Sequence, residues 1–309
     1  MRTPSTPRPP HPPHPPHPPH PPHPPHIGIF DSGIGGLSVL RALRCHVPLA
    51  QISYIADARF TPWGDRPTEW VQARAVQLSA WLLGGGADLV LVACNTATTQ
   101  AISTLRQRWP DTAFVGVEPG IKPAVAASRN GRVAVMATSG TLQSPRVARL
   151  VARHAGGAAV LRLPCPGLVE AIERAGPDDT RLHAVLDRIA ADLQAAQVDT
   201  VALACTHYPL VADALQARLG PEVQLVDTAD AVARQVARLL AQHTRQDALA
   251  PPARHAEQQV GQPPCSPAPT TATLLPRLLS TGNPALLQQA ARRWLQPDAL
   301  AEALALPDL

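Results

Sequence analysis

The sequence predicts an α/β fold with mainly parallel sheets, built from two similar units. Short apolar runs alternate with amphipathic helical stretches from residue 27 to residue 295, which is the pattern of repeated βαβ units. The stretches VLVACNTATT (90–99) and TVALACTHYP (200–209) are each an apolar run that ends in Ala-Cys and a polar cluster. The strand-and-turn stretches 27–36 and 133–142 repeat at nearly the same offset. We therefore interpret the chain as a duplicated domain.

Each predicted element rests on a local pattern. The glycine-rich turn DSGIGG (31–36) separates the first strand from a helix that opens at Leu37, and such a turn suits an anion at the helix N-terminus. It is not a dinucleotide fingerprint, because Ser38 replaces the third glycine of G-x-G-x-x-G. Short apolar runs predict strands at 27–30, 52–56, 89–93, 114–117, 132–136, 158–162, 200–204, 223–226 and 278–280. Helical spacing predicts helices near 68–83, 96–108, 144–154, 167–175, 180–195, 209–218, 229–242 and 284–295.

Two proline-rich segments interrupt this pattern. Residues 1–26 carry a His-Pro-Pro repeat that favours polyproline II, and we expect a disordered tail; a metal-binding tail is the alternative. Residues 246–272 are polar and proline-rich and predict a flexible insertion. A hinge is expected at Glu118-Pro119-Gly120. The expected organisation is a first domain of 27–118 with 229–296, a second domain of 119–228, and a C-terminal tail of 297–309.

Composition argues against several classes of protein. The net charge is +4 over 309 residues without a run of like charges, so nucleic-acid binding is disfavoured. The single lysine, Lys122, lacks a recognisable pyridoxal phosphate context. Apolar runs are too short for a transmembrane helix, and the N-terminus lacks the apolar core of a secretion signal. Cytoplasm is therefore the expected compartment.

The cysteines predict chemistry at two positions only. They lie at 45, 94, 165, 205 and 265, an odd number with wide spacings and no CxxC, which argues against a disulfide framework and a structural zinc site. Cys94 and Cys205 end equivalent predicted strands, where α/β sheets place ligands. Cys45, Cys165 and Cys265 lack the polar clusters that follow Cys94 and Cys205, and we interpret them as structural.

Two thiols at equivalent strand ends suggest one site approached from two sides. A thiol acts as an acid when protonated and as a base when ionised. A pair on opposite faces of a carbon could remove a proton from one face and return one to the other, which inverts a stereocentre without metal or cofactor. The alternative is that both cysteines are small buried hydrophobic residues.

Polar neighbours of the two cysteines favour the chemical interpretation. Hydroxyl and amide groups near them could donate hydrogen bonds to a substrate carboxylate, namely Ser32, Asn95, Thr96 and Thr206. His207, two residues after Cys205, could tune a thiol, although a structural histidine is equally compatible with the sequence. Asp31 could bind an ammonium group or assist a thiol.

Seven motifs together resemble the cofactor-independent aspartate/glutamate racemase superfamily, and glutamate racemases in particular. They are DSGIGGLSVL (31–40), YIADARFTPWG (54–64), VACNTAT (92–98), GVEPGIKPA (116–124), ATSGTLQS (137–144), CPGLVEAIERAG (165–176) and ACTHYPL (204–210). The resemblance runs from about residue 27 to residue 295, without the insertion. It implies two pseudo-symmetric, three-layer α/β domains with the active site in the cleft between them.

The resemblance also implies roles for individual residues. Cys94 and Cys205 would be the acid/base pair, the first acting on D-glutamate and the second on L-glutamate. Asp31, His207 and Glu173 would tune the thiols. Glutamate would contact Asp31, Ser32, Trp63, Gly64, Asn95, Thr96, Thr138, Thr206 and His207. No cofactor and no metal are implied, D-glutamate would feed peptidoglycan synthesis, and a homodimer is left open.

The chain departs from the family pattern at Trp63, where these enzymes usually have tyrosine. Tryptophan keeps a ring but replaces the phenol with an N–H donor, which puts this contact in question. Two rival functions stay open at this point: a racemase of the same superfamily that acts on aspartate or another amino acid, and an inactive homologue that only binds a small molecule.

Overall fold

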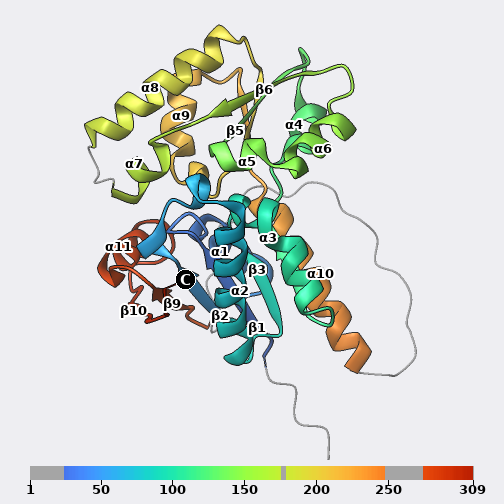
Figure 1. Ribbon diagram of the computed structural model, residues 1–309. Helices are drawn as coiled ribbons and strands as arrows, with labels where there is room; N and C mark the ends of the chain where they lie inside the picture. The colour runs from blue at the N-terminus through green and yellow to red at the C-terminus, as the bar shows by residue number, and fades with distance from the viewer. Residues whose placement is uncertain (1–23, 175–178, 248–273, 309) are drawn as a thin grey trace, which may run out of the picture.

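The computed structural model describes residues 24–174, 179–247 and 274–308, and its strands form two sheets (Figure 1). Every strand pairing in both sheets is parallel. The predicted α/β class with parallel sheets is therefore confirmed. We call the six-stranded sheet with its helices the large lobe, in the lower half of Figure 1, and the four-stranded sheet with its helices the small lobe.

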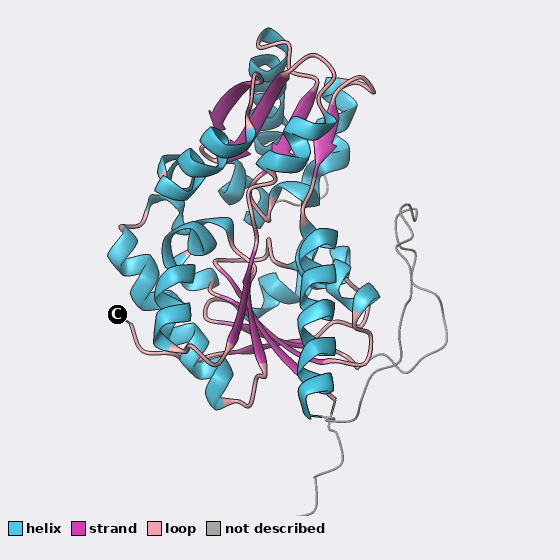
Figure 2. Ribbon diagram, turned by 90° about the vertical axis from the view of Figure 1, so that its right-hand side faces the viewer, coloured by secondary structure: helices cyan, strands magenta, loops and turns pink. Residues whose placement is uncertain are grey.

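The large lobe has the strand order β10-β9-β2-β1-β3-β4. Its strands are β1 (His26–Asp31), β2 (Gln51–Ala56), β3 (Leu89–Val92), β4 (Ala113–Gly116), β9 (Arg277–Ser280) and β10 (Ala301–Ala303). Its helices are α1 (Leu37–His46), α2 (Thr68–Gly84), α3 (Asn95–Arg108), α10 (Ala229–Asp247) and α11 (Pro284–Trp294), with short 3-10 turns at Ala58–Phe60 and Trp63–Asp65. Helices α2 and α3 pack together over one face and α1, α10 and α11 over the other, which gives three layers (Figure 2).

The small lobe has the strand order β6-β5-β7-β8. Its strands are β5 (Arg132–Ala137), β6 (Ala159–Pro164), β7 (Thr200–Leu203) and β8 (Gln224–Val226). Its helices are α4 (Ile121–Ala127), α5 (Ser139–Gln143), α6 (Pro145–His154), α7 (Leu168–Arg174), α8 (Thr180–Ala195) and α9 (Ala212–Leu219), with a 3-10 turn at Tyr208–Val211. Helices α4 and α6 share one hydrophobic cluster with the sheet, and α7 to α9 share the other.

The two lobes repeat the same strand arrangement. The order β2-β1-β3-β4 in the large lobe corresponds strand for strand to β6-β5-β7-β8 in the small lobe. Strands β3 and β7, which lead into Cys94 and Cys205, are fully buried, as expected where helices cover both faces of a parallel sheet. The sequence repeat is therefore a structural repeat, and it brings each cysteine to the end of the equivalent strand.

The structure adds elements that the sequence pattern did not predict. Helices α4 and α5 are short, and the small strand β10 falls in the expected C-terminal tail. Strand β1 begins at His26, one residue inside the expected N-terminal tail, and its ring Nε2 lies 2.9 Å from the Ser53 hydroxyl. Residues 1–23 of the expected tail and most of the 246–272 insertion lie outside the described residues, and the domain boundaries stay a prediction.

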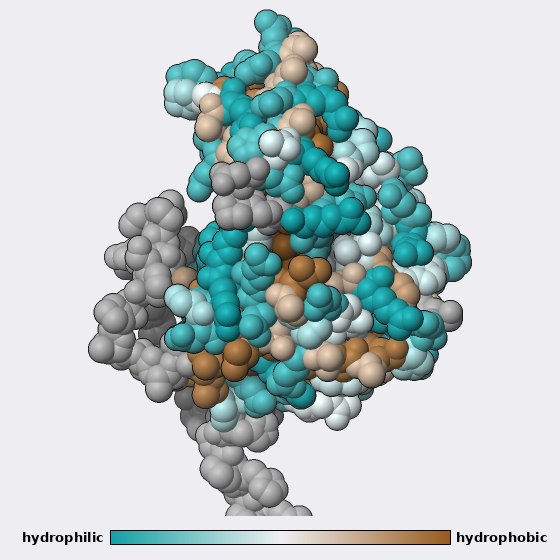
Figure 3. Space-filling view, turned by 90° about the vertical axis from the view of Figure 1, so that its left-hand side faces the viewer, coloured by the Kyte–Doolittle hydropathy of each residue, from teal (hydrophilic) through white to brown (hydrophobic). Residues whose placement is uncertain are grey.

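The surface is mainly hydrophilic on the face shown in Figure 3, with separate hydrophobic patches on the large lobe. Within the described residues, no helix combines the length and the apolar character that crossing a membrane requires.

Candidate active site

Cys94 and Cys205 line one cavity between the lobes. Cys94 has extended backbone angles and is the N-cap residue of α3, while Cys205 directly follows the residue after β7. Their exposed fractions are 5% and 6%. The duplicated βα unit therefore delivers one thiol from each lobe to a shared, nearly closed space.

The cavity wall is rich in hydroxyl groups and has no arginine or lysine. It is lined by Ser32, Pro62, Trp63, Gly64, Cys94, Asn95, Thr96, Thr138, Thr141, Val169, Cys205, Thr206 and His207. The volume of the cavity is about 10 Å³. That is room for about one water molecule, so an amino acid can enter only if the lobes move apart.

Asp31 organises the side of the cavity that carries Cys94. The Cys94 thiol donates to the Ser32 hydroxyl at 3.7 Å, and the Ser32 backbone N–H and hydroxyl both donate to Asp31 Oδ1. Asp31 Oδ2 accepts from the Gly36 N–H and from the Thr206 hydroxyl of the small lobe. Burial raises the pKa of Asp31, while the charge of His207 and the backbone donors oppose that rise.

The thiol of Cys94 is held in its neutral form. Burial raises the pKa of Cys94 well above its usual value, and the negative charge of Asp31 raises it further. Hydrogen bonding with the Ala97 backbone and with the Ser32 hydroxyl opposes these effects without outweighing them. At neutral pH, Cys94 is therefore set up to donate a proton.

Cys205 belongs to a relay of three side chains. His207 Nδ1 lies 3.8 Å from the Cys205 sulfur, and His207 Nε2 lies 2.6 Å from Glu173 Oε1. The same Glu173 oxygen accepts the N–H of Ile34 from the large lobe at 2.8 Å. Burial lowers the pKa of His207, but the hydrogen bonds to Cys205 and Glu173, together with the charge of Glu173, raise it well above its usual value. A protonated His207 places a positive charge beside the Cys205 sulfur.

Three threonine hydroxyls meet where α3 faces α5. Thr96 Oγ1 lies 3.0 Å from Thr138 Oγ1 and 3.2 Å from Thr141 Oγ1, and Thr138 donates to Thr141 at 3.0 Å. Thr138 is also the N-cap of α5, where its hydroxyl accepts the Thr141 N–H. Sequence analysis missed Thr141; its place three residues after a threonine N-cap was the available signal.

Asn95 and Trp63 direct their polar groups differently. Asn95 Nδ2 donates to the Val117 carbonyl at 3.3 Å, and its Oδ1 is buried without a hydrogen-bond partner among the described residues. Its oxygen is therefore an available acceptor. The Trp63 indole N–H donates to Asp57 at 3.2 Å, so the ring forms cavity wall and its polar atom is already used.

Gly64 lets the two lobes touch closely beside the cavity. A Cβ on Gly64 would lie 2.6 Å from the Cβ of Thr138, and a Cβ on Gly140 would lie 2.4 Å from the Gly64 carbonyl oxygen. Real side chains cannot adopt such separations. Glycine at both positions is what permits this seam between the lobes.

Most of the predicted site residues are brought together. The predicted residues that line the cavity are Ser32, Trp63, Gly64, Cys94, Asn95, Thr96, Thr138, Cys205, Thr206 and His207. Asp31 and Glu173 lie behind this wall and contact it through hydrogen bonds. Sequence analysis missed Pro62, Thr141 and Val169. In the described part of the chain, no group of three His, Cys, Asp or Glu side chains could hold a metal ion.

Comparison with known proteins places this chain in a family. The model of the Asp/Glu/hydantoin racemase family matches residues 38–236. The chain belongs to the Asp/Glu/hydantoin racemase family. Glutamate racemase of Cupriavidus pinatubonensis is 39% identical over 280 residues, which cover 91% of this chain and 95% of that protein. Glutamate racemase of Pseudomonas paraeruginosa is 44% identical over 214 residues, covering 69% of this chain and 81% of that protein.

Solved structures of family members share the fold. Glutamate racemase RacE1 of Bacillus anthracis aligns with a TM-score of 0.74 at 26% identity, covering 92% of this chain and 98% of that chain. Glutamate racemase of Escherichia coli, solved with L-glutamate and the activator UDP-MurNAc-Ala, aligns with a TM-score of 0.72 at 29% identity, covering 92% and 100%. The predicted family resemblance is confirmed, and the chain is an isomerase of the racemase class.

Proposed function

We propose that this protein interconverts L- and D-glutamate by proton transfer between its two active-site thiols. The observation that carries the proposal is that Cys94 and Cys205, one from each lobe, line the same cavity. The relatives named above are glutamate racemases, and one of the similar structures is a complex with L-glutamate. Both facts favour glutamate over the other substrates of the family.

In the proposed reaction, the two thiols face opposite sides of the α-carbon. With L-glutamate, the Cys205 thiolate removes the α-proton and the Cys94 thiol delivers its own proton to the opposite face. The products are D-glutamate, a Cys205 thiol and a Cys94 thiolate, so protons and charge balance. The reverse reaction begins with the Cys94 thiolate and D-glutamate.

The neighbours of each thiol support a different half of this cycle. His207 stabilises the Cys205 thiolate, and Glu173 keeps the imidazole oriented and protonated. Asp31 and Ser32 hold Cys94 in place through the contact of its sulfur with the Ser32 hydroxyl. The weak acidity of the α-carbon then demands stabilisation of the negative charge that develops on the substrate.

Hydroxyl and amide groups are the proposed contacts of the substrate carboxylates. Ser32, Asn95, Thr96, Thr138 and Thr206 line the cavity, and none of them carries a charge. Neutral donors fixed in a closed cavity stabilise a developing negative charge without the reorganisation that water would need. The unpaired Oδ1 of Asn95 is a proposed acceptor for the substrate ammonium group.

Exchange with solvent deuterium tests this function. The purified protein is incubated in D2O with L-glutamate, L-aspartate and other L-amino acids, and loss of optical rotation and α-proton exchange are followed. We expect both signals with glutamate. Loss of rotation with aspartate but not with glutamate would assign the protein to the aspartate branch, and no exchange with any amino acid would identify a binding protein without activity. Supply of D-glutamate to peptidoglycan synthesis is the role that we propose for the product.

A further inference from the structure

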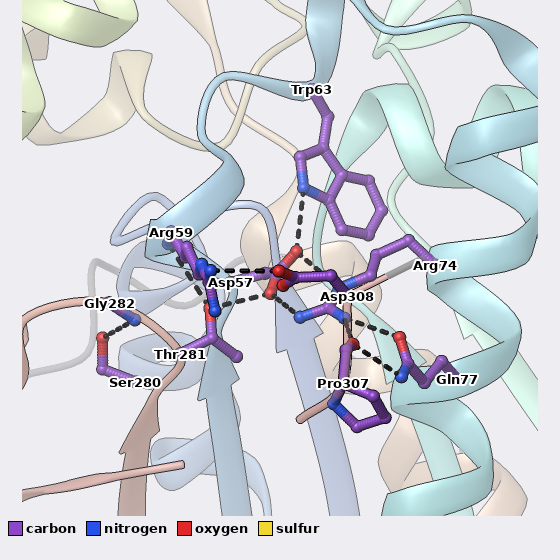
Figure 4. Close-up of polar contacts among 10 residues, drawn as sticks. All are labelled: Asp57, Arg59, Trp63, Arg74, Gln77, Ser280, Thr281, Gly282, Pro307 and Asp308. Atoms are coloured by element: carbon purple, nitrogen blue, oxygen red, sulfur yellow. Dashed lines mark hydrogen bonds and ion pairs between the residues drawn. The ribbon is translucent and has the colours of Figure 1, made fainter. Parts of the chain in front are cut away.

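Asp57 lies just behind the cavity wall and connects four parts of the large lobe (Figure 4). It follows β2 and is fully buried. Its carboxylate accepts hydrogen bonds from the Trp63 indole N–H at 3.2 Å, from the Thr281 hydroxyl at 2.8 Å, and from Arg74 at 2.6 and 3.0 Å. Its backbone N–H donates to the carbonyl of Asp31 at 2.9 Å. Asp57 therefore contacts two active-site residues, Asp31 and Trp63, from outside the cavity.

Arg74 holds the Asp57 carboxylate in one orientation. Arg74 is on α2, is fully buried, and binds Asp57 through both Nε and Nη2, which is a bidentate geometry. Its Nη1 donates to Gln77 Oε1 at 2.5 Å and to the Pro307 carbonyl at 3.1 Å. The guanidinium also lies 4.6 Å from the centroid of the Phe60 ring. All three guanidinium nitrogens are therefore engaged in hydrogen bonds.

Stability alone does not account for an ion pair at this depth. Removal of two charges from water costs several kcal/mol per ion, and a buried pair is often no more stable than well-packed hydrophobic residues. What a buried, bidentate pair provides is a fixed geometry. One group bound to this pair is the Trp63 indole, whose other close ring contacts are apolar, with Phe30 and Trp70.

We propose that Asp57 and Arg74 are a positioning pair for racemisation and act through Trp63. The pair orients the indole by its N–H and so sets the Trp63–Gly64 segment against Thr138 of the small lobe, where a Cβ added to Gly64 would collide with the threonine side chain. The inference rests on the proposed function for its kinetic consequence. Its structural part, the control of the Trp63 ring by Arg74, is measurable without any substrate.

Replacement of Arg74 by methionine tests the kinetic part. The Arg74→Met variant leaves Asp57 without its partner, so Trp63 loses its fixed acceptor. We expect kcat/KM to fall about 10- to 100-fold, the scale of a misplaced active-site wall, and to fall equally for both enantiomers because their free energies are equal. The matched control is Arg277→Met, which removes the exposed pair with Glu302 in the same lobe and should leave kcat/KM unchanged.

A double-mutant cycle separates positioning from a general structural role. Trp63→Phe keeps a ring but removes the donor to Asp57. If Arg74 acts through Trp63, the Trp63→Phe/Arg74→Met variant should be no slower than the slower single variant, because contacting residues in one network are not additive. If the two losses multiply instead, Arg74 does not act through Trp63 and the proposal is wrong.

Fluorine NMR of protein labelled with 5-fluorotryptophan provides the readout that needs no substrate. The chain has five tryptophans, and Trp63→Phe assigns the Trp63 signal. Arg74→Met should move or broaden that signal and leave the signals of Trp109 and Trp294 unchanged. A Trp63 signal that does not respond to loss of Arg74 overturns the proposal, whether or not the protein racemises glutamate.

A neutral replacement keeps the test decisive where Arg74→Met folds poorly. Asp57→Asn/Arg74→Gln removes both charges but retains an amide oxygen for the Trp63 N–H. We expect this variant to recover thermal stability, the Trp63 signal, and kcat/KM to within a few-fold of the unmodified protein. Recovery of stability and of the Trp63 signal without recovery of kcat/KM would contradict the proposal.

Discussion

The seam between Gly64 and Gly140 predicts that one methyl group will hold the active site open. Gly140 lies within α5 and its φ is not positive, so its backbone accepts alanine. A Cβ at this position would lie 2.4 Å from the Gly64 carbonyl oxygen and 3.1 Å from Gln100 Nε2. An ordinary contact begins at 3.4 Å. The lobes must therefore separate by about 1 Å at the seam, because the obstructing atom is backbone.

A displacement of that size matters because the two thiols belong to different lobes. Misplacement of reacting groups by about 1 Å can cost about 100-fold in rate, which corresponds to about 2.7 kcal/mol. We expect the Gly140→Ala variant to fold normally and to lose about 100-fold in kcat/KM for both enantiomers. Initial rates from optical rotation, with thermal unfolding measured in parallel, check both parts.

The control and the refuting result are equally specific. Gly84 ends α2 and has nothing within 4 Å of an added Cβ, so Gly84→Ala should leave kcat/KM unchanged. The cleft of about 830 Å³ that borders the seam includes both Gly64 and Gly140 in its wall. If Gly140→Ala racemises as fast as the unmodified protein, the closed contact at this seam is not needed for catalysis and our reasoning is wrong.

Three further predictions concern the residues around the thiols. Cys94→Ser and Cys205→Ser should each lose at least about 100-fold in racemisation rate, as expected for removal of an acid or a base; full activity of both variants would exclude a two-thiol mechanism. Glu173→Gln should lower the pKa of His207, so the pH at which activity falls on the alkaline side should shift downward in a rate profile. The stability linked to charged His207 is fully present below its unfolded pKa of about 6.5 and is lost as pH rises through the raised folded pKa. The free energy of unfolding in urea should therefore fall less between acidic and alkaline pH in Glu173→Gln than in the unmodified protein. Thr141→Val removes one of three clustered hydroxyls at similar volume and should raise KM for glutamate, with Thr99→Val, outside the cavity wall, as the control.

Much of the fold follows from local sequence patterns, and the missing parts have physical causes. The strands of both lobes are short apolar runs, so periodicity predicted β1 to β9 within one or two residues of their observed bounds. Helix α4 was not predicted because it is seven residues long and contains Pro123. Strand β10 was not predicted because Ala301–Ala303 gains its structure from pairing with β9 and not from its own composition.

The site was predictable where a motif carried it and not where contacts between lobes decide it. Cys94 and Cys205 were indicated by the internal repeat, which the strand order reproduces. The cross-lobe bond from Thr206 to Asp31 spans 175 residues and has no local signature. The contact of Trp63 was in question because an N–H donor replaces the usual phenol, and the structure shows that this donor is bound by Asp57, a residue that sequence alone gave no reason to select.

The duplication gives the two thiols equivalent places in the fold, but their surroundings carry opposite charges. Cys94 lies near the carboxylate of Asp31, which opposes its ionisation, while Cys205 lies beside the imidazole of His207, whose pKa is raised. The proposed cycle needs one proton donor and one proton acceptor at the start of each turnover, and these roles exchange when the other enantiomer is the substrate. The hydrogen bonds from Thr206 to Asp31 and from Ile34 to Glu173 join the two environments across the lobes. The observed arrangement of the lobes therefore places both thiols around one cavity, each with a different ionisable neighbour, Asp31 for Cys94 and His207 for Cys205.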